Sequence, residues 1–160
     1  MSINANQLRT LITEVLETIE LYSKDALELL MLTAAQETYC GTYIKQLGGG
    51  PALGIFQMEP NTHEDIWENY LCYNPSIFNK ILKLSMQKEF SINNAKYFDM
   101  IGNIPYQIGM ARIYYLRKKE ELPDAGDVLA MAEYYKKYWN TYKGKATVQE
   151  AIDNYIKYAF

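Results

Sequence analysis

The sequence has little histidine and little cysteine, and both shortages exclude kinds of chemistry. Its residues include one histidine, His63, and two cysteines, Cys40 and Cys72. A zinc site needs about four clustered ligands, often nitrogen or sulfur, and neither cysteine has zinc-site spacing to His63. A nucleophilic serine or cysteine needs a neighbouring base such as histidine. We therefore expect no metal site, two free and partly buried thiols, and a structural role for His63 in the first turn of a helix.

An excess of basic charge and a long apolar run are also missing. The chain has 16 Lys and Arg residues against 19 Asp and Glu, a net charge of −3. Proteins that bind nucleic acids usually carry a basic patch or stripe. Because this chain has none in its sequence, no nucleic-acid partner is expected. No stretch reaches the roughly 20 apolar residues that span a bilayer, and the amino-terminal residues lack the basic and apolar regions of a signal peptide. We expect a soluble protein.

Apolar residues recur at steps of three and four along most of the chain, which predicts a mainly α fold. The length of 160 residues suits one domain over residues 1–160. Helices are expected over 7–22, 24–40, 62–71, 75–88, 94–101, 105–121, 125–140 and 147–158. The second of these is apolar nearly all round, as is typical of a helix at the centre of a core. Only the glycine-rich segment 42–58 could hold short strands or a β-hairpin.

Two of the expected helices carry capping signals at their starts. Asn61 can cap the helix over 62–71, with Glu64 at its third position. Thr147 and Glu150 have the spacing of a capping box before the last helix. These residues predict where the two helices begin.

Glu37 lies near the end of the very apolar second helix, a position with chemical consequences. A carboxylate beside buried leucines and alanines loses solvation, which raises its pKa and keeps it protonated near neutrality. A general acid needs that property. The alternative interpretation is an ordinary exposed glutamate at the carboxyl end of a helix, and position alone does not decide between the two.

Three short motifs resemble those of the soluble lytic transglycosylase and goose-type lysozyme superfamily. Glu37-Thr38 stands where this family has Glu-Ser, and Gly54-Ile55-Phe56-Gln57 where it has Gly-Leu-Met-Gln. Residues 138–144 resemble its Ala-Tyr-Asn-x-Gly motif loosely, with Asn140 as the asparagine. Residues 54–67 and the tail from 132 to 147 also look like transglycosylase-like proteins of tailed phages. The similarity covers roughly residues 33–155.

This resemblance implies a lysozyme-like helical fold and a lytic transglycosylase or muramidase activity on the glycan strands of peptidoglycan, without a cofactor. Glu37 would protonate the oxygen between N-acetylmuramic acid and N-acetylglucosamine. The implied substrate-binding residues are Thr38, Gly54, Ile55, Phe56, Gln57, Tyr135 and Asn140. Partners would be the glycan strands and other phage virion proteins. The protein would reside in the virion, or in the host cytoplasm with delivery to the periplasm or cell wall.

The family typically acts with one carboxylate. After Glu37 gives up its proton, the N-acetyl group of the substrate can stabilise the sugar cation, an exception to the two-carboxylate rule of glycosidases. The muramic 6-hydroxyl would then attack and close a 1,6-anhydro ring, or water would attack instead. Glu59, Glu64 and Asp65 are candidates for a second carboxylate, although Glu64 and Asp65 already suit a helix amino terminus.

Two positions depart from the family pattern and keep other interpretations open. Thr38 replaces serine, and its added methyl group can crowd a hydrogen bond. Trp139 replaces tyrosine, and an indole donates a hydrogen bond but cannot accept one. One rival is a phage structural or assembly protein that keeps the fold without the activity. Another is a helical interaction module in which Glu37 has no role. The 15 tyrosines can line helix seams or form a sugar-stacking wall.

Overall fold

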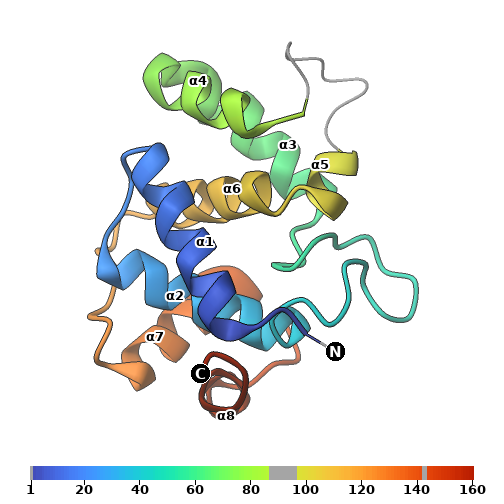
Figure 1. Ribbon diagram of the computed structural model, residues 1–160, viewed down its shortest axis with the longest axis vertical. Coiled ribbons are helices and arrows are strands. Elements are labelled where there is room, and N and C mark those ends of the chain that lie inside the picture. Colours follow the sequence, from blue (N-terminus) through green and yellow to red (C-terminus); the bar gives the residue numbers. More distant parts are fainter. Residues whose placement is uncertain (1, 87–96, 142–143) are drawn as a thin grey trace.

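The computed structural model describes residues 2–86, 97–141 and 144–160, and this part of the chain is mainly helical, as the sequence predicts (Figure 1). Its α-helices are α1 (Ala5–Thr18), α2 (Lys24–Thr38), α3 (Pro60–Asn69), α4 (Pro75–Leu84), α5 (Tyr97–Gly102), α6 (Ile104–Leu116), α7 (Val128–Tyr135) and α8 (Val148–Tyr158). A 3₁₀ turn, η1 (Leu71–Tyr73), follows α3, and a π-helical turn, η3 (Lys136–Asn140), continues α7. None of these described helices is long and apolar enough to cross a membrane.

Helix α2 is the centre of the core, as its apolar sequence predicts. It packs against α1, α6, α7 and α8, and ten of its residues are buried. Because other helices surround α2, none of its faces meets solvent, and this explains why the helix is apolar nearly all round. In Figure 1 helices α3 and α4 lie above α6 and α5 lies at its right-hand end, while α7 and α8 lie below α2. The carboxyl end of α2 thus emerges between the two groups of helices.

Several helix boundaries differ from those expected, for local reasons. Helix α1 ends at Thr18 rather than 22, because the chain turns through Glu20 with a φ of 57°. Asn61 is not the cap of α3: this helix begins two residues earlier, at Pro60, whose fixed φ suits a first helical position. The capping box of Thr147 and Glu150 is confirmed at the start of α8.

Other boundaries shift at the later helices. Helix α6 spans Ile104–Leu116, shorter than the expected 105–121, and α7 starts only at Val128, where the Asp127 side chain caps it. The expected helix over 75–88 ends at Leu84. Residues 87–88 and 94–96 of the expected helices lie outside the described residues.

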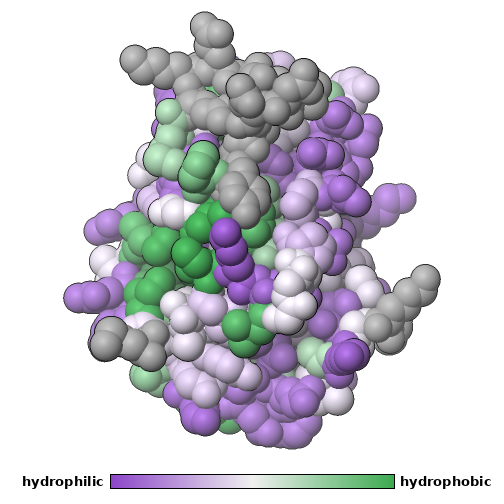
Figure 2. All heavy atoms as spheres, turned by 90° about the vertical axis from the view of Figure 1, so that its right-hand side faces the viewer, coloured by the Kyte–Doolittle hydropathy of each residue, from purple (hydrophilic) through white to green (hydrophobic). Residues whose placement is uncertain are grey.

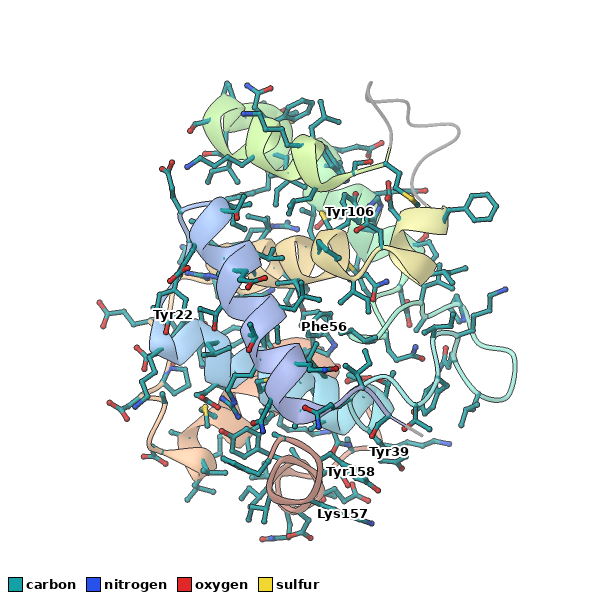
Figure 3. All side chains as sticks on the ribbon, viewed as in Figure 1. Tyr22, Tyr39, Phe56, Tyr106, Lys157 and Tyr158 are labelled. Carbon is teal, nitrogen blue, oxygen red and sulfur yellow. The ribbon has the colours of Figure 1, made fainter. Side chains whose placement is uncertain are left out.

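The chain leaves α2 through a strained turn. Tyr39, Cys40 and Gly41 follow one another with φ values of 53°, 54° and 83°, and for the two residues with side chains this conformation costs about 1 kcal/mol or more each. The turn brings the centroid of the Tyr39 ring to 4.8 Å from the centroid of the Tyr158 ring on α8. Figure 3 shows the two residues side by side. Both cysteines are free, but Cys40 is buried and Cys72 exposed, so neither is partly buried.

Between α2 and α3 the chain forms a long loop instead of a hairpin with strands. Within the described residues only isolated antiparallel bridges occur there, Lys45 with Leu53 and Leu53 with Met58. The loop projects from the right-hand side of Figure 1, and Figure 2 views the molecule from that side. Hydrophobic side chains gather near the middle of this face and hydrophilic ones surround them.

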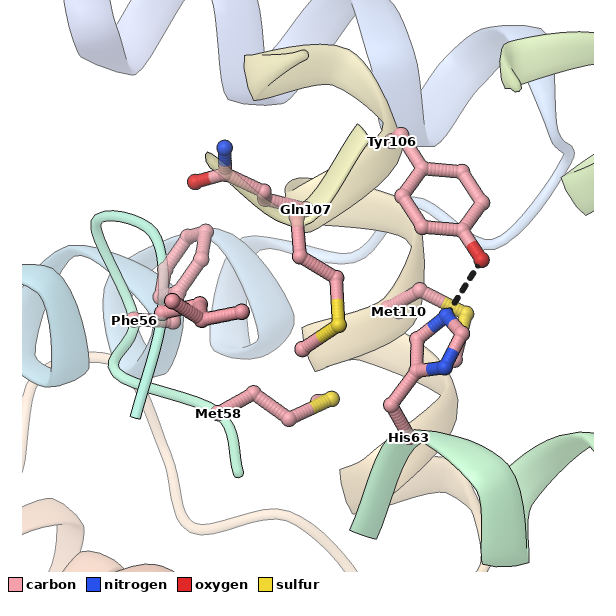
Figure 4. Close-up of a pocket in the computed structure, with 8 residues that line it drawn as sticks. Phe56, Met58, His63, Tyr106, Gln107 and Met110 are labelled. Carbon is pink, nitrogen blue, oxygen red and sulfur yellow. Dashed lines mark hydrogen bonds between the residues drawn. The ribbon is translucent and has the colours of Figure 1, made fainter. Parts of the chain in front are cut away.

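His63 lies in the core beneath this loop and has a structural role, as expected. It is 3% exposed, and its Nε2 lies 2.6 Å from the Tyr106 hydroxyl (Figure 4). The adjoining cavity measures about 10 Å³ and is lined by Leu53, Phe56, Met58, His63, Met100, Tyr106, Gln107 and Met110. A space of that size holds about one water molecule, so it is too small for a substrate.

Candidate active site

A much larger cleft lies where α2 ends, between the loop and η3. Its volume is about 750 Å³, within the range of about 300 to 1,000 Å³ typical of ligand sites. It is lined by Glu37, Tyr43, Gln46, Leu47, Ala52, Gln57, Glu59, Thr62, Tyr114, Trp139, Asn140, Thr141, Gly144, Lys145 and Ala146. Three of the expected site residues, Glu37, Gln57 and Asn140, therefore meet in one cleft although 103 positions separate the first from the last.

Glu37 occupies the last turn of α2 and is largely buried at the cleft. Burial raises the pKa of its carboxyl to about 7, although a hydrogen bond from Tyr135 acts to lower this pKa. The negative end of the α2 dipole also disfavours a carboxylate at this position. At neutral pH the carboxyl is therefore divided between its protonated and ionised forms, as a group that must both donate and accept a proton requires.

Tyr135 holds one oxygen of this carboxyl. Its hydroxyl donates a hydrogen bond of 2.5 Å to Glu37 Oε1, and burial together with the neighbouring Glu37 charge raises the pKa of the phenol far above its usual range. The phenol therefore stays protonated and always donates. Because Oε1 is the acceptor, Oε2 is the oxygen left to carry the acid proton of neutral Glu37.

Thr38 points away from the cleft into the protein. It is fully buried, and its hydroxyl donates to the Ile55 carbonyl at 2.7 Å and accepts from the Gly41 amide at 2.9 Å. On the other side of the turn, the Gln107 side chain accepts from the Ile55 amide at 2.8 Å. Thr38 thus fixes the turn 54–57 to the end of α2, and its hydroxyl is engaged within the protein.

The turn itself needs its glycine and exposes one side chain to the cleft. Gly54 has a φ of 75°, and a Cβ there would lie 2.4 Å from the Met100 carbonyl oxygen, so no larger residue fits. Ile55 and Phe56 are buried, as Figure 3 shows for Phe56 in the interior. Gln57 lines the cleft, and its Nε2 donates to the Gly54 carbonyl at 2.8 Å.

The expected substrate-binding residues therefore divide into two groups. Gln57 and Asn140 line the cleft. The others, Thr38, Gly54, Ile55, Phe56 and Tyr135, are buried behind its wall. The five buried residues can contribute to a substrate site only through their backbone or through the groups that they position, because their side chains have almost no exposed surface.

Trp139 lines the cleft, whereas Tyr135 is buried beside Glu37. The Trp139 indole lines the cleft and packs against Phe56 at 6.4 Å and Tyr114 at 4.7 Å between ring centroids. The phenol that contacts Glu37 comes instead from Tyr135, four positions earlier. The sequence does not predict the hydrogen bond between Tyr135 and Glu37. Its one hint is that Tyr135 lies five residues before Asn140.

Of the three candidates for a second carboxylate, one lines the cleft. Glu59, the residue before α3, does so. Asp65 is paired with Arg117 at 2.7 Å, and Glu64 is exposed on α3 outside the cleft lining. No cluster of His, Cys, Asp or Glu suited to a metal ion occurs among the residues that the structure describes.

Comparison with known protein families, curated proteins and solved structures finds no match to this chain.

Proposed function

We propose that this protein cuts peptidoglycan glycan strands at the β-1,4 bond between N-acetylmuramic acid and N-acetylglucosamine, with Glu37 as the single acid and base. The observation that carries the proposal is a glutamate in a large cleft, with a pKa near 7 caused by burial and one oxygen fixed by Tyr135. The motif resemblance and the mainly helical fold favour a lysozyme-like protein over other helical proteins with a buried acid.

The geometry around Glu37 suits a one-carboxylate reaction. Neutral Glu37 would donate the Oε2 proton to the glycosidic oxygen while the bond from that oxygen to C1 of the muramic residue breaks. The N-acetyl carbonyl oxygen of the same sugar would stabilise the cation at C1. Ionised Glu37 would then take the proton of the muramic 6-hydroxyl as its oxygen bonds to C1. This closes the 1,6-anhydro ring and returns Glu37 to its neutral form.

The cleft wall suits a sugar chain. Gln57 and Asn140 offer amide groups to hydroxyl and N-acetyl groups, and the Tyr43 and Trp139 rings can pack against the apolar faces of pyranose rings. Because the residue resemblance points to tailed phages, we place the activity in the virion during delivery of the genome or in host lysis.

The test is mass spectrometry of the muropeptides released from purified peptidoglycan by the wild-type protein and by Glu37→Gln. Anhydro-muramic products that disappear in the variant are expected. Products with a reducing end would instead show water attack by a muramidase. If several types of wall release nothing with the wild-type protein, the proposal is wrong, and a virion structural protein without activity takes its place.

A further inference from the structure

The backbone carbonyl of Glu37 has a side-chain partner, the hydroxyl of Tyr43. The last carbonyls of a helix have no amides from a further turn and need other donors. Backbone amides of the chain that follows α2 bond to the carbonyls of Ala34, Ala35 and Thr38. The Glu37 carbonyl accepts instead from the Tyr43 hydroxyl at 2.6 Å. The residue that carries the acid is thus held through its backbone by a phenol six positions later.

This hydrogen bond closes the strained turn at the end of α2. The residues with positive φ that follow the helix lie between the two residues that the bond joins. Next to Tyr43, the Ile44 carbonyl accepts from the Gly54 amide at 2.9 Å. The segment that holds the backbone of Glu37 therefore also holds the first residue of the turn 54–57.

The phenol of Tyr43 is a constant donor and also a part of the cleft wall. Burial raises the pKa of its hydroxyl above the usual value, so the group is protonated at neutral pH. Tyr43 is half-buried and lines the same cleft as Glu37. Phenylalanine at this position would remove the hydrogen bond and keep the ring, so the two contributions can be measured separately.

We propose that Tyr43 is a positioning residue for Glu37, whose hydroxyl holds the last turn of α2 and so keeps the carboxyl at its buried place in the cleft. A helix end that lacks such a partner frays. Fraying would let water reach the carboxyl and would move it from the position that proton transfer requires. Tyr135 holds the carboxyl itself, whereas Tyr43 holds the backbone that carries it. The catalytic consequence rests on the proposed function, but the effect on the carboxyl does not.

The experiment is a carboxyl ¹³C NMR titration of Glu37 in the wild-type protein, in Tyr43→Phe and in the control Tyr39→Phe. Tyr39 is exposed in the same turn, and the centroids of its ring and the Tyr43 ring lie 6.3 Å apart. In Tyr43→Phe we expect the Glu37 pKa to fall by about half a unit or more, because a carboxyl that gains solvent returns toward its ordinary pKa. Tyr39→Phe should keep the wild-type value.

An unchanged or raised Glu37 pKa in folded Tyr43→Phe would overturn the proposal. A rise would mean that the carboxyl had lost its Tyr135 donor rather than gained water. If Tyr43→Phe does not fold, Tyr43→Met removes the same donor with a flexible side chain that fills irregular space. It must lower the pKa in the same way, and an unchanged value again overturns the proposal.

The kinetic test uses purified peptidoglycan as the substrate. Tyr43→Phe should lower kcat about tenfold with little change in KM, because the ring remains in the cleft wall while the acid is misplaced. A raised KM with an unchanged kcat would show that the hydroxyl binds substrate instead, and would overturn the positioning role. A wild-type protein without activity refutes the proposed function alone, because the titration still tests Tyr43.

Discussion

Replacing Glu37 with glutamine should stabilise the protein at alkaline pH and leave its stability at acid pH nearly unchanged. Burial raises the pKa of Glu37 from its ordinary 4.5 to about 7, and one pKa unit corresponds to about 1.4 kcal/mol. Between these two pH values the folded protein keeps a proton that the unfolded chain has lost, so stability falls as the pH rises. Above pH 7 the free energy of unfolding is therefore lower by about 3 kcal/mol than at pH values below 4.5.

Glutamine removes this loss because it resembles the protonated acid in shape and its oxygen can still accept from Tyr135. Urea unfolding of both proteins at several pH values from 4 to 8.5 would measure the effect. The variant should match the wild type near pH 4 and exceed it by about 3 kcal/mol at pH 8.5. A stability difference that does not change with pH would refute the assignment of a raised pKa to Glu37.

Substitutions at three further positions test the surroundings of Glu37. Tyr135→Phe removes a hydrogen bond to a charged group, worth about 1.5 to 3 kcal/mol, so the Glu37 pKa should rise by about one unit or more; a carboxyl ¹³C titration that shows no rise contradicts the bond. Glu59→Gln should retain the products and most of the rate on purified peptidoglycan, and a loss of cleavage would instead identify a second catalytic carboxylate. Thr38→Val should destabilise the protein by about 2 kcal/mol, because the Gly41 amide loses its acceptor. Thr38→Ser should cost clearly less in the same unfolding assay, and equal losses would rule out the hydroxyl as the cause.

The sequence predicts those features that depend on local pattern. The apolar circumference of α2 predicts a central helix, and the capping box at Thr147 follows from a spacing of three residues. The position of Glu37 on this helix left both a raised pKa and an ordinary exposed glutamate open, and the raised pKa follows from its burial in the fold. For the capping box, neighbours along the chain supply the decisive interaction.

Features that depend on residues far apart in the sequence could not be predicted from local pattern. The hydrogen bond of Tyr135 to Glu37 joins residues 98 positions apart. The inward orientation of Thr38 depends on Ile55, 17 positions away and beyond a glycine-rich loop. The burial of Thr38 and Tyr135 behind the cleft wall therefore could not be predicted from the sequence.

The π-helical turn makes the site dependent on a single extra residue in the backbone. A π-helix pairs residues five apart, and most single π turns amount to one residue inserted into an α-helix, so Tyr135 and Asn140 come to one side of η3. Each residue of an α-helix turns the chain by about 100°. If the same residues formed a regular α-helix, Asn140 would therefore lie about 140° around the helix axis from Tyr135. Straightening η3 into an α-helix, with no change in sequence, would thus be enough to separate the two side chains.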